Sequence, residues 1–208
     1  MSRQISRSVS PVADEAFRRR IEPVRRFALD AESVARACYD MAVRFHRGGK
    51  LITFGNGGAS ADAQHIAVEF VHPVIVGKRA LPAMSLASDI ATVTGIANRE
   101  GFSQIFAHQL PALASPADIA LGISADGHCT SVLSALVTAH GMGLLTLALT
   151  GGDGGEIATS PAVDHVFVAG SEDPLLVKEV HVTAYHVLWE LVHVFFEQPG
   201  LLGPEMVR

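Results

Sequence analysis

The most informative stretch of the sequence is Leu51-Ile52-Thr53-Phe54-Gly55-Asn56-Gly57-Gly58-Ala59-Ser60. Its first four residues are apolar or β-branched, as in a short buried strand, and the glycines after them are typical of a tight turn into a helix. Such a strand–turn–helix unit presents backbone N–H groups at the helix N-terminus, where they suit an anion. The turn is neither a Walker A loop, since no Lys-Ser/Thr pair follows, nor a dinucleotide fingerprint, since its third glycine is misplaced. The stretch therefore predicts either an anion site or a purely structural turn.

Short apolar runs alternate with helical patterns along the rest of the chain. We expect strands at Leu51–Phe54, Ala83–Leu86, Ile119–Ile123, Leu144–Leu149 and Val166–Val168. We expect helices near residues 58–72, 89–112, 130–141 and 174–196. This repeated β–α order predicts a three-layer α/β sandwich around a five-stranded parallel sheet. Ligands bind beyond the carboxyl ends of the strands in such sheets, so the residues that follow each run are the candidates for a site.

The composition indicates a single globular domain. Of the 208 residues, 49% are hydrophobic and 18% are charged, which argues against a disordered or fibrous chain. The net charge of -5 argues against direct binding to nucleic acid. The two cysteines, Cys38 and Cys129, lack metal-binding spacing and indicate a reducing cytoplasm. We expect neither export nor a membrane span, because the chain has no signal-like start and no run of about 18 apolar residues.

Residues 1–48 differ in composition from the rest, because most of the arginines lie there and the first glycine is Gly48. We expect a helical extension at 1–48 and the main domain at 49–208. Helical spacing after Asp30, a reasonable N-cap, predicts a helix that ends at the glycines after residue 47, and Pro23 should break or kink the segment before it. The extension is either a packing helix or an arm that forms oligomers.

Two later loops offer polar groups at the same edge of the predicted sheet. The third strand leads into Ser124-Ala125-Asp126-Gly127-His128-Cys129-Thr130-Ser131, in which Ser124, Thr130 and Ser131 carry hydroxyl donors. The Asp126 carboxylate would repel a phosphate there unless a cation intervened. The fourth strand leads into residues 150–155, which read as a tight turn with a helix start.

His65 and Glu69 stand four residues apart on the helix after the first loop, so they share one face. On the last helix, Lys178, Val182 and His186 fall along one side, at the edge of a broader apolar stripe. Both sets could face one crevice. Taken singly, each histidine also reads as a packing residue and Glu69 as a solvated charge.

Together these residues resemble the phosphoheptose isomerases of the sugar isomerase (SIS) family. The resemblance rests on Phe54–His65, Glu69, Asn98, Gly122–Ser124, Thr150–Gly155 and Glu179–His186. It implies a flavodoxin-like parallel sheet, a homotetramer assembled partly through the N-terminal helices, and active sites at subunit contacts. It also implies isomerisation of sedoheptulose 7-phosphate to an aldoheptose 7-phosphate.

The resemblance also implies residue roles. Moving a proton between adjacent carbons through an enediol needs a base and an acid, and Glu69 and His186 match the family's base and acid. Some relatives hold zinc through residues that match His65, Glu69 and His186 plus a glutamine, and zinc could polarise the carbonyl. The expected substrate-binding residues are Asn56, Gly57, Gly58, Ser60, Asn98, Arg99, Ser124, Asp126 and Lys178.

The sequence departs from the family at several of these positions. The family's phosphate loop usually reads Ser-Thr-Ser-Gly-Asn-Ser, whereas residues 124–129 keep only the first serine and the glycine. Lys178 stands where the family has glutamine, so the fourth zinc ligand is missing. Arg99 and Leu175 replace acidic residues, and Pro73 replaces a basic one.

Two explanations of these departures compete. Lys178 and Arg99 could supply the cationic grip on a phosphate, with Asp126 paired to one of them or to a substrate hydroxyl; this favours an isomerase. Alternatively the phosphate site has been lost, which leaves a non-catalytic SIS protein that binds a sugar phosphate or a protein partner such as a replication initiator. An isomerase or deaminating aldolase-type enzyme for another phosphosugar is a third interpretation.

Overall fold

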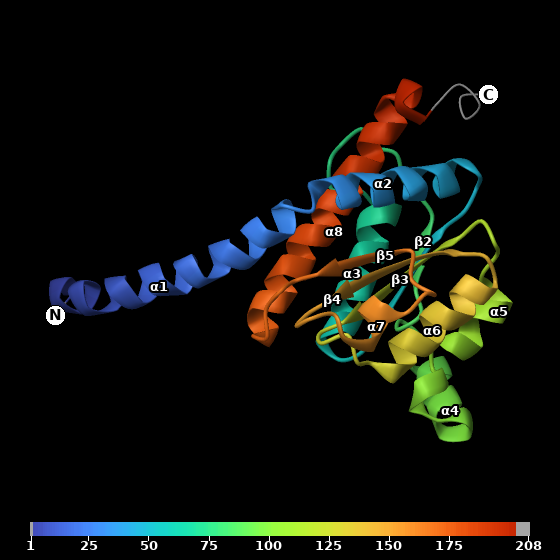
Figure 1. Ribbon diagram of the computed structural model, residues 1–208, viewed down its shortest axis with the longest axis horizontal. Coiled ribbons are helices and arrows are strands. Elements are labelled where there is room, and N and C mark those ends of the chain that lie inside the picture. Colours follow the sequence, from blue (N-terminus) through green and yellow to red (C-terminus); the bar gives the residue numbers. More distant parts are fainter. Residues whose placement is uncertain (1, 203–208) are drawn as a thin grey trace.

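The computed structural model describes residues 2–202 and has a five-stranded parallel sheet at its centre (Figure 1). The strand order is β2-β1-β3-β4-β5. The strands are β1 Leu51–Gly55, β2 Ala83–Ser85, β3 Ile119–Ser124, β4 Leu145–Thr150 and β5 His165–Val168. All four pairings are parallel, so every strand ends at the same edge. The predicted sheet is confirmed, with strand ends shifted by at most one residue.

Helices cover both faces of the sheet, which gives the three predicted layers. The helices of the main body are α2 Ala31–His46, α3 Gly58–Val71, α4 Ile90–Glu100, α5 Leu110–Leu113, α6 Thr130–Gly141, α7 Gly155–Thr159 and α8 Pro174–Glu197. Odd-numbered strand residues such as Leu121 and Leu147 pack with α2, α3 and α8, whereas Ala120 and Ala148 pack with α6 on the other face. This alternation follows from the two-residue period of a strand.

The helix expected at 89–112 is interrupted. It ends at Glu100 because Gly101 adopts a φ of +92°, a left-handed conformation that favours glycine and stops the helix. Two short 3₁₀ turns, Phe102–Gln104 and Ala107–Gln109, then lead into the single turn of α5. The chain therefore folds back over the sheet where the sequence pattern predicted one long helix.

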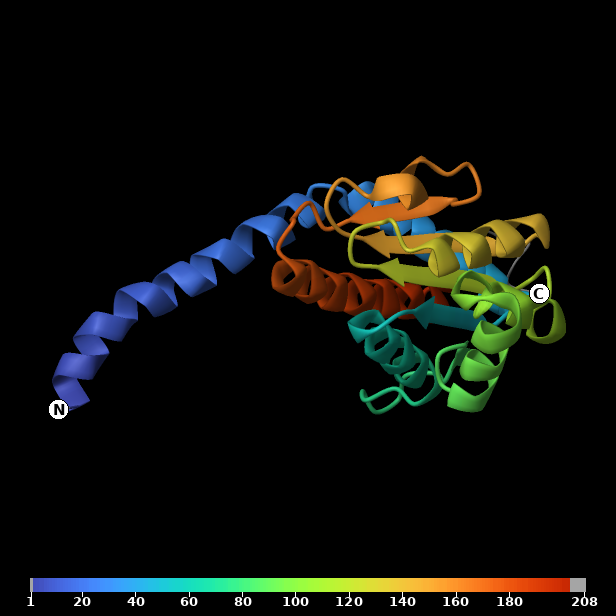
Figure 2. The same cartoon turned by 90° about the horizontal axis from the view of Figure 1, so that it is seen from below.

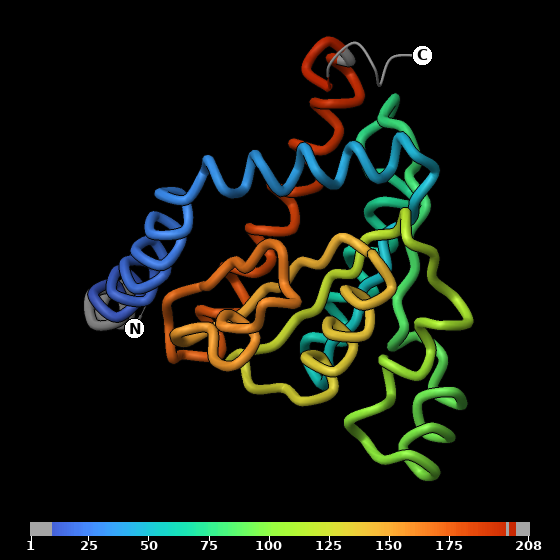
Figure 3. The backbone as a smooth tube through the Cα atoms, turned by 45° about the vertical axis from the view of Figure 1, so that its right-hand side comes forward, coloured from blue at the N-terminus to red at the C-terminus, as the bar shows by residue number. Residues whose placement is uncertain are grey.

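The N-terminal segment is helical, as expected, but Pro23 does not break it. Helix α1, Ser2–Ala28, passes through Pro23 and curves away from the body (Figure 2). A proline removes one backbone hydrogen bond, and here the helix continues past it. Asp30 precedes α2 at the predicted position, although its side chain makes no capping hydrogen bond. Figure 3 shows α2 crossing α8, on which it packs.

Only the last third of α1 rests on the body. Phe27 packs edge-on against Phe167 of β5, with 6.2 Å between ring centroids, and Arg20 pairs with Glu179 of α8. The rest of the helix projects from the molecule (Figure 1). In the part of the chain that the structure describes, no helix combines the length and the apolar character that crossing a membrane requires.

Candidate active site

The turn between β1 and α3 forms as the sequence predicts. Gly57 has a φ of +57° and precedes the first residue of α3. A side chain at Gly55 would lie 2.9 Å from the Ala59 side chain and from the Ile123 carbonyl, so the strand can approach its neighbours only with glycine there. The turn points α3 along the sheet and fixes where the polar residues of that helix lie.

Helices α3 and α8 bring His65, Glu69 and His186 together. One side-chain donor atom from each lies within 4.8 Å of the others, although 117 residues separate Glu69 from His186. His65 Nε2 is 3.1 Å from Glu69 Oε1. Glu69 is only 9% exposed, whereas both histidines are exposed. The arrangement is a shielded carboxylate beside two accessible imidazoles.

Neighbouring groups orient this cluster. His186 donates its Nδ1–H to the Val182 carbonyl at 2.8 Å, which leaves the Nε2 lone pair free. Trp189 donates its indole N–H to the Glu69 carbonyl at 2.9 Å and so ties α8 to α3. Tyr185 forms a 3.2 Å hydrogen bond with His65 Nδ1. Burial, followed by the nearby charges of Asp62 and Glu69, raises the pKa of Tyr185 to about 12, so its hydroxyl stays protonated.

Sequence reasoning missed Tyr185 and Trp189. The available signal was their spacing, because Tyr185 follows Lys178 by two helical turns and Trp189 follows Tyr185 by one. The apolar stripe of α8 hid both, since aromatic residues at these positions also read as core. The structure shows that each is buried and also makes a polar contact with α3.

The donor set of the cluster fits zinc. Two imidazoles and one carboxylate are a combination found around catalytic zinc, with the fourth position open to water or substrate. Lys178 adds no ligand, because an ammonium group has no lone pair. Its Nζ instead binds both carboxylate oxygens of Asp62, at 2.7 and 2.8 Å.

A cavity of about 460 Å³ lies at the carboxyl edge of the sheet, and its lining does not include His65, Glu69 or His186. Its lining includes five of the predicted substrate-binding residues, namely Asn56, Gly58, Ser124, Asp126 and Lys178. Asp126 accepts hydrogen bonds from the His128 N–H at 3.0 Å and from the Ser124 hydroxyl at 3.2 Å. The His128 hydrogen bond in particular lowers the pKa of Asp126. The pairing of Asp126 with Lys178 or Arg99 that we considered does not form in the structure, since Lys178 pairs with Asp62.

The loops around this cavity brace one another. Ser124 Oγ accepts hydrogen bonds from the backbone N–H groups of Gly127 and Cys129, at 3.0 and 3.4 Å. Asn56 donates to Ser131 Oγ at 2.6 Å and so joins the β1 loop to the β3 loop. The Ser124 hydroxyl is therefore engaged within its own loop, and the polar groups that point into the cavity are held by their neighbours.

The loop that follows β4 supports the loop that follows β3 from outside the cavity. Ser124 and Thr150 are register partners on β3 and β4, so the loops that follow them run side by side. A side chain at Gly127 would lie 1.9 Å from the Gly154 carbonyl, which means that the two backbones touch. Gly154 is the N-cap of α7, which starts at Gly155, so residues 150–155 form the tight turn and helix start that we expected.

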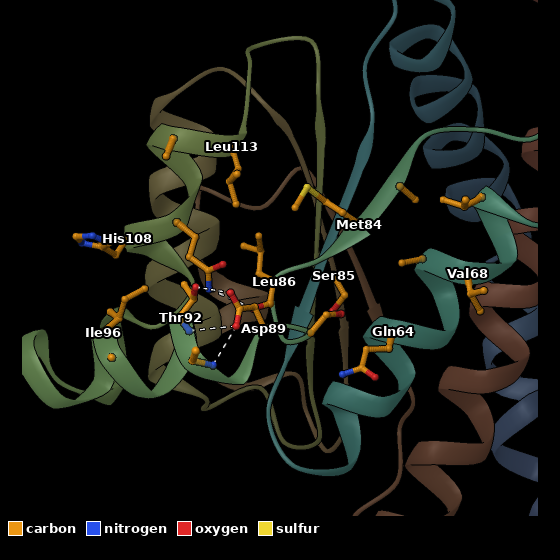
Figure 4. Close-up of a pocket in the computed structure, with 18 of the residues that line it drawn as sticks. Gln64, Val68, Met84, Ser85, Leu86, Asp89, Thr92, Ile96, His108 and Leu113 are labelled. Atoms are coloured by element: carbon orange, nitrogen blue, oxygen red, sulfur yellow. Dashed lines mark hydrogen bonds between the residues drawn. The ribbon is translucent and has the colours of Figure 1, made fainter.

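The remaining predicted residues lie elsewhere within this chain. Asn98 and Arg99 are on α4 and line a separate cavity of about 1170 Å³ between α3, β2 and α4 (Figure 4). Figure 4 shows Gln64 and Val68 on the α3 side of that cavity. It also shows Asp89 at the start of α4, where its carboxylate accepts hydrogen bonds from the backbone N–H and the hydroxyl of Thr92. Arg99 is exposed and lies 3.8 Å from Glu100. Ser60 donates to the Gly57 carbonyl at 2.7 Å, in the turn itself.

Comparisons with known proteins identify the family and the fold. Residues 16–151 match the sequence model of the SIS domain family. The chain is 40% identical over 205 residues to the phosphoheptose isomerase of Solidesulfovibrio magneticus, covering 98% of each chain. Among solved structures, the phosphoheptose isomerase of Francisella tularensis has a TM-score of 0.82 at 30% identity, with 90% of this chain and 98% of that one covered. Phosphoheptose isomerase GmhA of Neisseria gonorrhoeae has a TM-score of 0.80 at 28% identity, with 88% and 98% covered.

Proposed function

Because the chain belongs to the phosphoheptose isomerases of the SIS domain family, we propose that it converts sedoheptulose 7-phosphate into D-glycero-D-manno-heptose 7-phosphate. Family membership makes the chain a sugar-phosphate isomerase and favours this role over a non-catalytic SIS protein. The observation that carries the proposal is that side-chain atoms of Glu69 and His186, on two helices far apart in the sequence, lie within 4.8 Å of each other.

The reaction transfers one proton between neighbouring carbons and another between their oxygens. In the proposed mechanism, Glu69 removes the C1 proton of the ketose and returns it to C2 of the enediol. His186 supplies and accepts the proton that passes between O1 and O2, through the Nε2 atom that its Val182 hydrogen bond leaves free. The low exposure of Glu69 supports this role, because a base screened from water keeps the abstracted proton from exchanging with solvent.

A zinc ion would be held by His65, Glu69 and His186; it would then occupy the Nε2 lone pair of His186, so the proton-transfer roles given above are those of the metal-free site. It would supply a positive charge that polarises the carbonyl and stabilises the enediolate. Lys178 takes no part in such a site. The chain would therefore offer three protein ligands, one fewer than the four that the family resemblance implies for a zinc site.

Lys178 is the cation that we propose for the anionic end of the substrate. Lys178 lines the cavity that Ser124 and Asp126 also line. The side chain is 48% exposed, so the ammonium can contact a ligand while Asp62 holds it in place. Arg99 lines a different cavity, so within one subunit we assign the grip on phosphate to Lys178 and the backbone N–H groups of the loops, with Asp126 left to bind a sugar hydroxyl.

We also propose that residues 1–48 assemble a homotetramer and that the site lies at a subunit contact. Two observations support this. Helix α1 leaves Phe17 69% exposed and Ile21 46% exposed, one turn apart on a helix that projects from the body. The imidazoles of the cluster are exposed as well, as expected of a site that a second subunit covers.

The direct test compares turnover of sedoheptulose 7-phosphate by the wild type and by Glu69→Gln. Loss of the carboxylate base should lower kcat by at least about 100-fold. Glu156→Gln is the matched control, because it removes one carboxylate from an exposed position on α7, away from the cluster, and should keep the wild-type rate. Equal rates for the wild type and Glu69→Gln, or no turnover by the wild type, would overturn the proposal.

A further inference from the structure

Tyr185 contacts the candidate active site without lining either cavity. It is 2% exposed and belongs to the core between α8 and the sheet. Its hydroxyl nevertheless reaches His65 Nδ1 at 3.2 Å, and the two rings meet edge-on with centroids 5.5 Å apart. The other ring nitrogen of His65 faces Glu69. His65 is therefore held at both ends, by a carboxylate on its own helix and by a hydroxyl from α8.

The two histidines of the cluster are held by different kinds of group. The partner of His186 Nδ1 is a carbonyl, which only accepts, so that ring must keep its proton on Nδ1. The partner of His65 Nδ1 is a hydroxyl, which both donates and accepts. His65 can therefore carry its proton on Nε2, toward Glu69, or on Nδ1, with the Nε2 lone pair toward the cluster. Tyr185 satisfies the Nδ1 atom in either case, and the ring does not need to turn.

We propose that Tyr185 is a positioning residue, whose hydroxyl holds the His65 ring against Glu69 and accommodates both of its neutral tautomers. The inference rests on the proposed function, since it gives His65 a place in that site. The tautomer with a free Nε2 is the one that can bind a metal ion, and the other is the one that donates to the Glu69 carboxylate. Groups that hold the second nitrogen of a metal-binding histidine commonly affect both metal affinity and activity.

The variant that isolates the hydroxyl is Tyr185→Phe, which keeps the ring and its packing. Tyr39→Phe is the matched control, because the sequence has only two tyrosines and the Tyr39 ring packs against Phe195 rather than a site residue. Urea unfolding of both variants establishes that each is folded. A purely structural role of the hydroxyl would change stability alone.

The first readout needs neither metal nor turnover. Nitrogen-15 NMR of the metal-free protein with labelled histidine reports the tautomer of each ring, and His65→Gln identifies the His65 signals by their loss. We expect the His65 Nδ1 signal to move in Tyr185→Phe, because it loses its hydrogen-bond partner, and to stay unchanged in Tyr39→Phe. An unmoved His65 signal in Tyr185→Phe overturns the proposal.

The second readout is zinc affinity, measured by competition with a chromophoric chelator. We expect Tyr185→Phe to bind zinc about 10- to 100-fold more weakly and to lose kcat by a similar factor while KM changes by less than about 3-fold. Wild-type zinc affinity together with wild-type kcat in this variant also overturns the proposal. If the wild type fails to isomerise the heptose phosphate while the His65 signal still responds to Tyr185→Phe, the proposed substrate is wrong and the positioning role stands.

Discussion

At the scale of single residues, the ion pair between Lys178 and Asp62 joins α8 to α3 at the lining of the smaller cavity. Asp62 is nearly buried, and both of its oxygens bind the Lys178 ammonium. A buried carboxylate that loses its partner keeps the cost of desolvation without the compensating attraction. Lys178 thus has two roles in our account, one in holding Asp62 and one in binding the anionic end of the substrate.

The first prediction concerns this pair. Lys178→Met should lower the free energy of unfolding by about 1–2 kcal/mol, less than for a fully buried pair because Lys178 is half-exposed. The same variant should raise KM for the heptose phosphate more than it lowers kcat, since it removes binding rather than proton transfer. Urea midpoints and steady-state kinetics measure the two effects.

The control for this prediction is Lys78→Met. Lys78 pairs with Glu197, whose side chain is 54% exposed and can be solvated when the lysine is lost. We expect a change below about 0.5 kcal/mol and unchanged kinetics for that variant. If both lysine variants lose the same stability and the same affinity, Lys178 has no special role.

The spacing of residues within one helix predicted part of the site. The parts that it did not predict depend on contacts between helices. The four-residue spacing placed His65 and Glu69 on one face of α3, and the structure agrees. The approach of His186 was implied by the family resemblance, because one helix's periodicity does not say what lies opposite it. For the same reason the partner of Lys178 could not be predicted, since Asp62 lies 116 residues away in the sequence and meets it only through packing of α8 on α3.

At the scale of elements, the loops after β3 and β4 act as one unit. Gly127 has a φ of +75°, and its backbone lies against Gly154 and Gly155 of the neighbouring loop. The sequence predicted both turns from their glycines, but their contact depends on the register of Ser124 with Thr150 across the sheet. The end of α4 at Gly101 could not be predicted for a similar reason, because a glycine within an apolar pattern does not reveal whether its φ is positive.

The second prediction tests this contact. Gly127→Ala should lower the free energy of unfolding by at least about 2 kcal/mol, because it combines a left-handed backbone with a side chain that would meet the Gly154 carbonyl. It should also raise KM, since the Ser124 loop must shift. Urea unfolding and kinetics at saturating and subsaturating substrate measure both. Gly141→Ala is the control, because nothing lies within 4 Å of the added methyl group on α6, and stability equal to that of Gly127→Ala would contradict the account.

At the scale of the whole molecule, the sheet and its two helical layers could be predicted because buried parallel strands read as apolar runs and their helices as amphipathic ones. The direction in which α1 leaves the body could not be predicted. The sequence indicates a helix with a proline inside it, whereas the angle at which the helix leaves the body depends on the contacts of Phe27 and Arg20 with β5 and α8. The projecting part of α1 has few contacts of its own chain to stabilise it, which is the physical reason for proposing that other subunits do so.

The last prediction follows from that reasoning. The double variant Phe17→Asp/Ile21→Asp places two charges on the exposed apolar face of α1, and a subunit interface there would have to bury them at a large cost. Light scattering after size exclusion should show a tetramer for the wild type and a smaller species for the variant, with unchanged circular dichroism. Activity should fall with the mass, because His65 and His186 are exposed in a single chain. Val76→Asp is the control, since it charges a fully exposed apolar residue outside α1; a tetrameric double variant would show that α1 does not form the interface.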